Sequence, residues 1–375
     1  MSVLITKGSS IKALVCARSL GKQGIDVIVG DSGPNPSSVS KYVKGSLKYP
    51  SPLNEKAFIE YISHYCSIKG IKMILPVHSE DTYLIAKNRS LIEDRGTIVP
   101  LAHYKDIIKI NDKSILPSIA ENAGIPIPQT YVPKSIGDVE DIAIKCHYPV
   151  VLKLRNATSS TGIMYLNDRS SLISGFKKTV NRFGLKASEY PLIQEYVKGT
   201  GYGVSVLYNH GEIRALFTHK RIREFPISGG PSTARVSVHN KKLEEMAVRL
   251  MDSVYWHGLA MVEFKFDEKT GEAWLIEVNP RVWGSIYQAV AAGVDFPYLL
   301  YRMSIDGDIK PVKDYNTGVY TRYLLNDIRA FPKYQKAQGI SFLKDFFSLK
   351  YLCDDFQCDD PLPFFSLGLY NMFKH

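Results

Sequence analysis

Two carboxylates and a carboxamide recur at matching positions in two neighbouring segments. Residues 260–266 (AMVEFKF) and 273–279 (AWLIEVN) alternate between apolar and polar side chains, and the link at 267–271 (DEKTG) is polar and contains glycine. This pattern predicts two antiparallel strands joined by a short turn. Successive side chains of a strand point to opposite faces, so we expect one polar and one apolar face. The polar face carries Glu263, Lys265, Glu277 and Asn279, and the apolar face carries Val262, Phe264, Phe266, Trp274, Ile276 and Val278.

The polar face has two interpretations. Like charges on adjacent strands repel each other unless a cation lies between them. Mg²⁺ usually takes one or two carboxylates and completes its octahedron with water and phosphate oxygens, which makes Glu263, Glu277 and Asn279 candidate metal ligands. Arg281 follows Asn279 closely in the sequence and could then face an anion. The plain alternative is that these side chains form the solvated face of a half-buried hairpin.

A lysine inside an apolar run is the next candidate. Lys153 lies in the expected strand 149–154 and is followed by a run of small residues, with Ser159, Ser160, Thr161 and Gly162 at its end. Backbone N–H groups and hydroxyls in such a loop could wrap a phosphate, although the GxxxxGK[ST] pattern is absent. The plain alternatives are a lysine that extends to solvent and an ordinary surface loop.

Two further segments carry candidate binding groups. Residues 191–197 (PLIQEYV) predict an apolar strand whose edge, at Glu195, Tyr196 and Val197, could pair with an adenine rim. Residues 219–224 (HKRIRE) precede paired glycines, which would allow a loop to close over an anion. An ordinary strand and a solvated charge run are the alternatives.

The first part of the chain is expected to form a parallel sheet. Apolar runs at 3–5, 27–29 and 73–75 are separated by helical patterns, and strands that alternate with helices are typical of such sheets. The loop after the first strand has no GxGxxG pattern, which argues against dinucleotide binding. Because ligands of parallel sheets bind at the carboxyl ends of the strands, residues 78–80 (HSE) are candidates for substrate contact.

Composition narrows the class of protein. The chain has 375 residues, and roughly 150 residues per domain predicts two or three domains. It shows no transmembrane segment and no leader peptide, and five scattered cysteines suggest reduced thiols, so we expect a cytoplasmic protein. The net charge of +10 favours anionic partners, but the basic residues form no long run, so nucleic acid is not expected.

Taken together, these segments resemble the ATP-grasp superfamily, specifically its carboxylate–amine ligase branch, which includes D-aspartate ligases and shares the ATP-binding fold of carbamoyl-phosphate synthase. The resemblance spans about residues 3–305, and its most specific part is MVEFKFD with LIEVNPRVWGS. It implies an α/β and α+β fold in which a Rossmann-like N-terminal domain precedes a two-lobed ATP-grasp domain. The expected divisions are a pre-ATP-grasp domain at 1–110, an ATP-grasp domain at 111–308 with a small lobe at about 125–195 and a large lobe at about 196–308, and an aromatic and basic extension at 309–375.

The resemblance also implies roles for the candidate residues. Glu263, Glu277 and Asn279 would hold two Mg²⁺ ions, with Mn²⁺ as an alternative. Lys113 and Lys153 would contact the phosphates of ATP. The loop Ser159, Ser160, Thr161 and Gly162 would cover the phosphates, Glu195, Tyr196 and Val197 would border the adenine, and Arg281, Lys220 and Arg221 would face the acyl phosphate or the substrate carboxylate. One departure is that residues 199–203 (GTGYG) offer no acid for the ribose hydroxyls.

The implied activity is ATP-dependent ligation. A carboxylate would become an acyl phosphate, and an amine would then displace the phosphate to form an amide, with ADP as the other product. Small-molecule acid and amine substrates are therefore expected, and homo-oligomerisation is left open. The alternatives are an ATP-dependent carboxylase, an acyl-thiol ligase, or a non-catalytic relative that binds anions.

Overall fold

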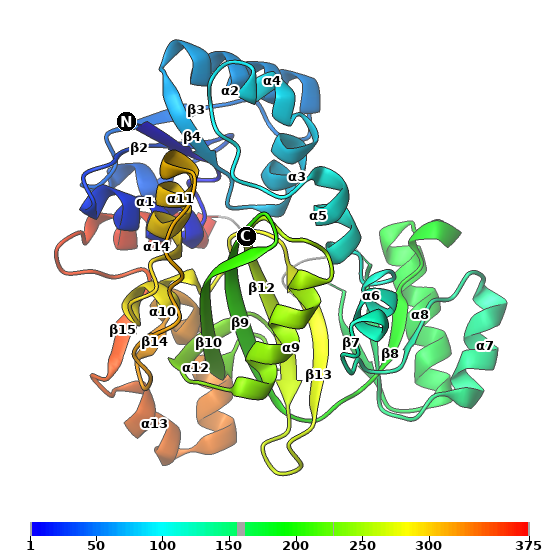
Figure 1. The fold of residues 1–375 in the computed structure, drawn as a ribbon. Coiled ribbons are helices and arrows are strands. Elements are labelled where there is room, and N and C mark those ends of the chain that lie inside the picture. The colour runs from blue at the N-terminus through cyan, green and yellow to red at the C-terminus, as the bar shows by residue number, and fades with distance from the viewer. Residues whose placement is uncertain (1, 156–161, 228, 374–375) are drawn as a thin grey trace.

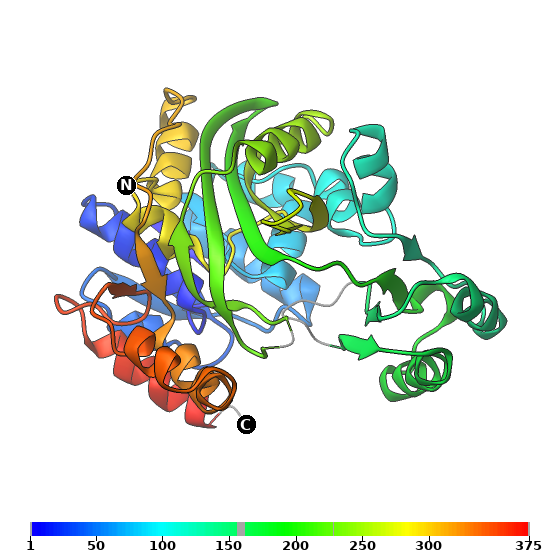
Figure 2. The same cartoon turned by 90° about the horizontal axis from the view of Figure 1, so that it is seen from below.

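The computed structural model describes residues 2–155, 162–227 and 229–373. In this part of the chain the strands form three sheets (Figure 1). An N-terminal parallel sheet, a small antiparallel sheet and a large, mainly antiparallel sheet surround one cleft. In Figure 2 the small sheet lies at one end of the molecule and the C-terminal helices lie at the other.

The N-terminal sheet has the strand order β3-β2-β1-β4, and all its strands are parallel. Its strands are β1 (Ser2–Ile5), β2 (Asp26–Asp31), β3 (Gly45–Lys48) and β4 (Ile71–Leu75). The helices that follow are α1 (Ile11–Lys22), η1 (Pro36–Val39), α2 (Glu55–Ile68), α3 (Ser79–Lys87) and α4 (Arg89–Glu93). Val3 and Ile5 pack on the side of α1, and Leu4 packs on the side of α2. Helices therefore cover both faces of this sheet, as its continuous apolar strands predict.

The small sheet has a core of its own. Its strands, in the order β5-β8-β6-β7, are β5 (Thr130–Tyr131), β8 (Leu192–Glu195), β6 (Val150–Lys153) and β7 (Met164–Leu166). The helices α7 (Ile136–Lys145) and α8 (Arg169–Phe183) pack on one face, and η2 (Ala187–Glu189) leads into β8. Val150 and Leu152 point into this core, so the alternation of β6 turns Val151 and Lys153 to the opposite face.

The large sheet has the order β13-β12-β9-β10-β11-β14-β15. Its strands are β9 (Thr200–Asn209), β10 (Glu212–Glu224), β11 (Ser232–Ser237), β12 (Gly258–Phe266), β13 (Ala273–Asn279), β14 (Tyr320–Arg322) and β15 (Tyr351–Cys353). The helix α9 (Lys241–Asp252) packs on one face, through Leu243 and Met246. The helices α10 (Ile286–Ala291) and α11 (Phe296–Asp306) pack on the other. The hydrophobic cores on the two faces of the large sheet both continue into the N-terminal sheet, and they thereby join the two sheets.

The remaining helices connect and close these units. Helices α5 (Tyr104–Asn111) and α6 (Leu116–Asn122) lead from the N-terminal sheet to the small sheet, and α12 (Leu324–Gln338), α13 (Ile340–Phe346) and α14 (Leu362–Phe373) form the C-terminal segment. Because β14 and β15 belong to the large sheet, that sheet continues past residue 308. The exact domain divisions stay a prediction. No helix in the described part of the chain combines the length and the apolar character needed to cross a bilayer.

Buried ion pairs attach the C-terminal segment to the rest of the chain. Arg18 of α1 donates to Asp360 at 2.8 Å, and both side chains are 2% exposed. Arg235 of β11 pairs with Asp354, which is also buried. The aspartates that follow residue 352 showed no chemical signature in the sequence. Their partners are far away along the chain and are brought to them only by the fold.

Candidate active site

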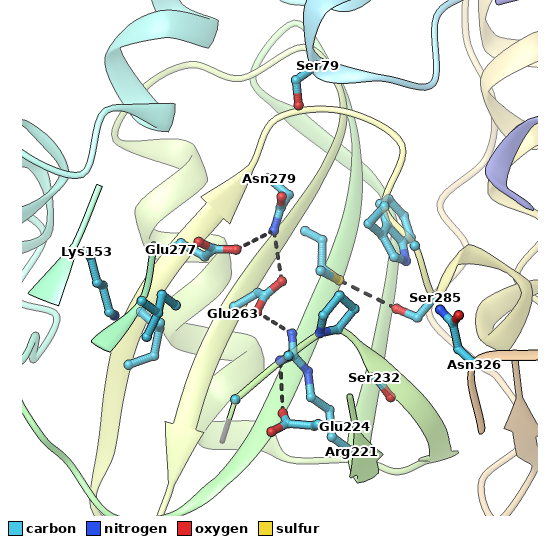
Figure 3. Close-up of a pocket in the computed structure, with 18 of the residues that line it drawn as sticks. Ser79, Lys153, Arg221, Glu224, Ser232, Glu263, Glu277, Asn279, Ser285 and Asn326 are labelled. Carbon is cyan, nitrogen blue, oxygen red and sulfur yellow. Dashed lines mark hydrogen bonds and ion pairs between the residues drawn. The ribbon is translucent and has the colours of Figure 1, made fainter. Parts of the chain in front are cut away.

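One cavity of about 660 Å³ lies where the sheets meet, and Figure 3 shows part of its lining. Residues from the loops of the N-terminal sheet, from the small sheet, from the large sheet and from the C-terminal helices all line it. Among the sequence-predicted residues, those in the lining are His78, Ser79, Lys113, Lys153, Glu195, Tyr196, Val197, Arg221, Glu263, Glu277, Asn279 and Arg281. The fold thus brings together groups that are up to about two hundred residues apart along the chain and that lie on or beside three different sheets.

The three candidate metal ligands point at one another. Glu263 of β12 pairs in register with Glu277 of β13, and Met261 pairs with Asn279. The Asn279 amide donates Nδ2–H to Glu263 Oε1 at 2.9 Å and to Glu277 Oε1 at 3.2 Å (Figure 3). The antiparallel hairpin predicted from the alternating pattern is confirmed, and its polar face looks into the cavity rather than outward to solvent.

A bulge changes which side chains form the apolar face of this hairpin. The register shifts between Glu263 and Phe264, so that Phe264 pairs with Leu275 and Ile276 is the extra residue. Ala273 and Leu275 therefore pack in the core, whereas Trp274 pairs with Lys265 and Ile276 lines the cavity. The expectation that Trp274 and Ile276 lie on the apolar face was wrong, because one inserted residue reverses the alternation beyond it.

Cations surround the two carboxylates. Lys113 Nζ lies 3.3 Å from Glu277 Oε2, and Arg221 pairs with Glu263. Burial alone would raise the pKa of Glu277, but Lys113, Lys153 and Arg221 together hold it below its ordinary value. Burial raises the pKa of Glu263, and the Arg221 charge opposes that shift only in part. The pair is thus arranged so that one carboxylate is more firmly ionised than the other.

Lys153 reaches the cavity from the small sheet. Its Nζ donates to Gln194 Oε1 at 2.6 Å, and Gln194 in turn donates to Thr130 Oγ1 at 2.8 Å. Burial lowers the pKa of Lys153 to about 8. The lysine therefore does not simply extend to bulk solvent, which was the plain alternative, but is held in place by a neighbouring strand.

The candidate adenine border lies beside Lys153. Glu195 ends β8 and accepts a hydrogen bond from the His147 backbone N–H at 3.2 Å. The Tyr196 ring contacts Tyr165 edge-on, with the ring centroids 5.9 Å apart. Val197 follows in the lining. A partly exposed strand end with an aromatic side chain is suited to hold a planar base.

Part of the proposed phosphate loop lies outside the described residues. These are Ser159, Ser160 and Thr161. Gly162 is described and has a φ of +72°, and a Cβ there would lie 2.7 Å from a Leu154 side-chain carbon. It is not one of the residues that line the described cavity. The glycine is therefore required by backbone conformation and by its close contact with Leu154.

The two cations at 220 and 221 do not lie in a loop. They belong to β10, which continues to Glu224, so successive side chains point to opposite faces. Lys220 pairs with Glu268 at 2.5 Å and is not among the lining residues, whereas Arg221 enters the cavity and pairs with Glu263 and Glu224. The expectation of a flexible loop in which both cations face the substrate was wrong on this point, because the strand separates them.

Glycines in β9 allow Arg221 to reach Glu263. The strand β9 lies between β10 and β12, and Gly203 pairs with Glu263 in register. A Cβ at Gly201 would lie 2.8 Å from Arg221 Cδ. Because no side chain rises from β9 at this point, the guanidinium can extend across the strand. The GTGYG segment therefore supplies space for an ion pair, and it still offers no acid for a ribose.

Arg281 lies at the side of the cavity formed by the N-terminal sheet. Its Nε donates to Ser79 Oγ at 2.7 Å, and its Nη1 donates to the Val282 carbonyl at 3.1 Å. Ser79 and His78 line the cavity, but Glu80 is exposed and is not in the lining. Helix α3 begins at Ser79, so of the three candidates at the end of β4 two line the cavity and Glu80 does not.

Several lining residues had no signal in the sequence. They come from α1 and from the C-terminal segment, and they include Lys12, Tyr323, Asn326, Arg329, Tyr370 and Asn371. Those of the C-terminal segment reach the cavity because α14 packs against η1 and α12 follows β14. Lys12 interrupts an otherwise apolar stretch of α1, and that was the one local feature that could have marked it.

Comparisons with known proteins agree with this architecture. Residues 187–325 match the family model "ATP-grasp in the biosynthetic pathway with Ter operon". The N-terminal section of the carbamoyl phosphate synthase large chain from Methanopyrus kandleri is 22% identical over 317 residues, covering 80% of this chain and 54% of that protein. A D-alanine–D-alanine ligase from Acetivibrio thermocellus is 24% identical over 221 residues, covering 51% of this chain and 56% of the ligase. The chain thus spans about half the length of these curated relatives.

Solved structures share the fold at low sequence identity. The L-amino acid ligase from Bacillus licheniformis has a TM-score of 0.64 and 15% identity, covering 83% of this chain and 77% of the ligase. N5-Carboxyaminoimidazole synthetase from Staphylococcus aureus, complexed with ADP, has a TM-score of 0.65 and 17% identity, covering 84% and 79%. The biotin carboxylase domain of Hydrogenobacter thermophilus 2-oxoglutarate carboxylase, with MgADP and bicarbonate, has a TM-score of 0.67 and 18% identity, covering 85% and 73%.

Proposed function

We propose that this chain, which has the ATP-grasp fold, is an ADP-forming carboxylate–amine ligase. A substrate carboxylate attacks the γ-phosphorus of ATP and becomes an acyl phosphate, and an amine then displaces the phosphate to form an amide. The observation that carries this proposal is the convergence of Glu263, Glu277 and Asn279 with Lys153 across one cavity. Phosphoryl transfer depends mainly on positioning and charge neutralisation, and this set of residues supplies both.

The donor set suits Mg²⁺. No group of three or more His, Cys, Asp or Glu side chains that could hold a metal ion occurs among the described residues. Mg²⁺ needs fewer protein ligands than that, because it keeps waters and binds phosphate oxygens. Glu263 and Glu277 would supply two carboxylates, and Asn279 would add its amide oxygen by turning from its present donor position. We expect two Mg²⁺ ions, with Mn²⁺ as an alternative, and they would neutralise charge on the transferring phosphoryl group.

The cations of the cavity would act on the phosphates. Lys153 and Lys113 face the carboxylate pair, so a triphosphate bound there would lie between them and the large sheet. Its negative charge would return the Lys153 pKa toward the ordinary lysine value and keep the ammonium protonated. The strand end at Glu195, Tyr196 and Val197 would hold the adenine.

Two arginines would bind anions, Arg221 the acyl phosphate and Arg281 a carboxylate or phosphate group of a substrate. Arg221 is already fixed between Glu263 and Glu224, so little conformational entropy would be lost when it binds an anion. Arg281 is held by Ser79 on the opposite side of the carboxylate pair. A planar guanidinium presents two parallel N–H donors to a phosphoryl or carboxylate group, which suits both arginines to this role. Lys220 has no part in this proposal, because its side chain pairs with Glu268 on the other face of the sheet.

The acceptor distinguishes this proposal from its closest alternative, an ATP-dependent carboxylase or acyl-thiol ligase. The activation step would be the same in each case. We therefore propose a screen in which amino acids and small peptides are incubated with ATP, Mg²⁺ and hydroxylamine, which traps an acyl phosphate as a hydroxamate. A matched series with bicarbonate and with thiols identifies the acceptor class from the mass of the product.

The screen has a matched control in Glu277→Gln. We expect ADP release and a hydroxamate for at least one acid with the native chain, and a strongly reduced rate with the variant. ADP release that requires bicarbonate and no other acid would favour the carboxylase. If the native chain shows no Mg²⁺-dependent binding of nucleotide and no ADP release, the proposed activity is wrong and a non-catalytic anion-binding role is favoured. None of the five cysteines forms a disulfide within the described part of the chain, and we propose a cytoplasmic location.

A further inference from the structure

The cavity extends to the carboxyl ends of the adjacent strands β1 and β4 of the N-terminal sheet, and we call this part of it the crevice. The strand β1 pairs with β2 on one side and with β4 on the other. The chain therefore first adds β2 and β3 on one side of β1 and then places β4 on the opposite side. The helix α1 follows β1 and packs on one face of the sheet, whereas α3 follows β4 and packs on the other. At such a switch in strand order the two loops separate, and parallel sheets commonly bind ligands there. Both helices begin at this crevice, and helix N-termini favour anions, although the Ser10 hydroxyl already accepts from the Lys12 backbone N–H of α1.

A buried lysine lies in this crevice. Lys12, near the start of α1, is 9% exposed and lines the cavity. Its ammonium forms no hydrogen bond or ion pair with any residue that the structure describes. Asp81 is the acid that acts on it electrostatically, but that carboxylate is fully buried and accepts from the Tyr49 hydroxyl at 3.2 Å. A buried cation without a counter-charge costs free energy, so a second charge is expected beside it.

Arg281 adds a second cation to the same crevice. It forms no ion pair with a described residue: its guanidinium donates to the Ser79 hydroxyl and the Val282 carbonyl, and the Glu277 and Glu263 carboxylates act on it only from a distance. Burial lowers the pKa of Lys12, and the nearby Arg281 charge lowers it further. Two like charges that repel each other at the wall of an open cavity would both be stabilised by an anion placed between them.

We propose that Lys12, Arg281 and Ser79 form an anion-binding subsite for a substrate group that does not react. The inference rests on the proposed function, in which ATP occupies the part of the cavity between Lys153 and Glu277. One of the two substrates then carries an anionic group, a carboxylate or a phosphate ester, besides the groups that are joined. The subsite would hold that group at the carboxyl end of β1 and β4 and so orient the substrate toward the carboxylate pair.

The test measures anion binding while the nucleotide site is filled. The full chain is saturated with Mg²⁺ and a nonhydrolysable ATP analogue, and inorganic phosphate and succinate are then titrated calorimetrically. We expect Lys12→Met to weaken binding of the preferred anion at least tenfold while nucleotide affinity changes less than twofold. Lys12→Arg keeps the charge and should retain most of the anion affinity. Lys22→Met, at the exposed end of the same helix, is the matched control and should behave like the native chain.

The outcomes separate this inference from the proposed function. Anion affinity that is unchanged in Lys12→Met but lost in Lys153→Met would overturn the subsite, because the anion would then bind at the nucleotide phosphates. No detectable binding of either anion by the native chain would also overturn it. If the native chain does not bind the nucleotide, the anions are titrated without it. The proposed ATP site can then be wrong while the test of the subsite still gives an answer. Tighter binding of phosphate than of succinate would assign a phosphorylated substrate, and the reverse a substrate with an additional carboxylate.

Discussion

Arg221 and Lys220 are adjacent cations that the strand β10 turns to opposite faces, and they provide a matched test of the site. Arg221 is 15% exposed and pairs with Glu263 inside the cavity, whereas Lys220 is 32% exposed and pairs with Glu268 outside it. Replacing each with Met removes one positive charge and keeps an unbranched apolar stem. The two substitutions thus differ mainly in which face of the sheet loses its charge.

The expected magnitudes are far apart. Removing a preorganised electrostatic donor from a water-poor site commonly costs about 3 to 4 kcal/mol of barrier, so kcat for ADP release should fall roughly 100- to 1000-fold in Arg221→Met. An exposed ion pair contributes only about 0 to 1 kcal/mol, so Lys220→Met should stay within about fivefold of the native rate. The native distances support this ranking, because Arg221 is also held by Glu224 at 3.1 Å and is ordered before substrate binds.

The assay is the initial rate of ADP release with saturating Mg·ATP and an acid and amine from the hydroxylamine screen. Circular dichroism and nucleotide affinity control for folding of each variant. Equal rate losses in the two variants would refute the assignment of Arg221 to the reacting groups. A loss confined to Lys220→Met would show that the functional face of β10 is the opposite one.

Three further perturbations test other parts of the structure. Glu277→Gln removes a proposed metal ligand and the partner of Lys113, and we expect ADP release to fall by at least about 100-fold; a near-native rate with an intact circular dichroism spectrum would exclude Glu277 from the metal site. Asp360→Asn leaves the buried Arg18 without its carboxylate and should lower the unfolding free energy by about 3 to 5 kcal/mol. The exposed neighbour in Asp359→Asn should cost at most about 1 kcal/mol, and equal urea midpoints for the two variants would contradict this difference. Burial lowers the pKa of Lys153 to about 8. If bound phosphate restores a pKa near 10.4, ATP binding at pH 9 should be accompanied by the uptake of about 0.9 proton. Calorimetry in buffers of different ionisation enthalpy measures this proton uptake, and Lys153→Met should abolish it.

Local patterns predicted the main elements well. The alternation in residues 260–266 and 273–279 corresponds to β12 and β13, and the apolar runs of the first hundred residues form β1, β2 and β4. The ATP-grasp fold inferred chiefly from residues 260–266 and 273–279 is confirmed by the family model and by the solved structures. These features depend on hydrophobic periodicity over a few residues, which the sequence displays directly.

The expectations from sequence were wrong where one extra residue reverses the alternation of a strand, or where tertiary structure decides the local conformation. The bulge beside Glu277 adds one residue to β13, and nothing in the segment AWLIEVN marks that position. The run 219–224 is rich in charges and precedes glycines, but the pairing of β10 with β9 and β11 keeps it extended. Burial of Arg223 against Asp327 at 2.7 Å satisfies one of these charges, and its partner is too distant in sequence for a local pattern to reveal.

The C-terminal segment shows the same limit more clearly. Its aspartates bind arginines in α1 and β11, and Asn326 and Asn371 line the cavity. Each of these contacts joins residues that are far apart along the chain. The sequence therefore predicted the polar residues that line the cavity on the β12–β13 side, whereas the wall that faces them could be recognised only from the structure.

The central claim is that Glu263, Glu277 and Asn279 hold a divalent ion that binds the triphosphate of ATP. A crystal structure of the chain with Mg²⁺ and a nonhydrolysable ATP analogue tests it most directly. We predict Mg²⁺ at about 2.0 to 2.1 Å from oxygens of both glutamates and of the nucleotide, with Lys153 beside the phosphates. Nucleotide bound elsewhere, or Glu263 and Glu277 still bonded only to Arg221, Lys113 and Asn279 while nucleotide is present, would contradict the claim.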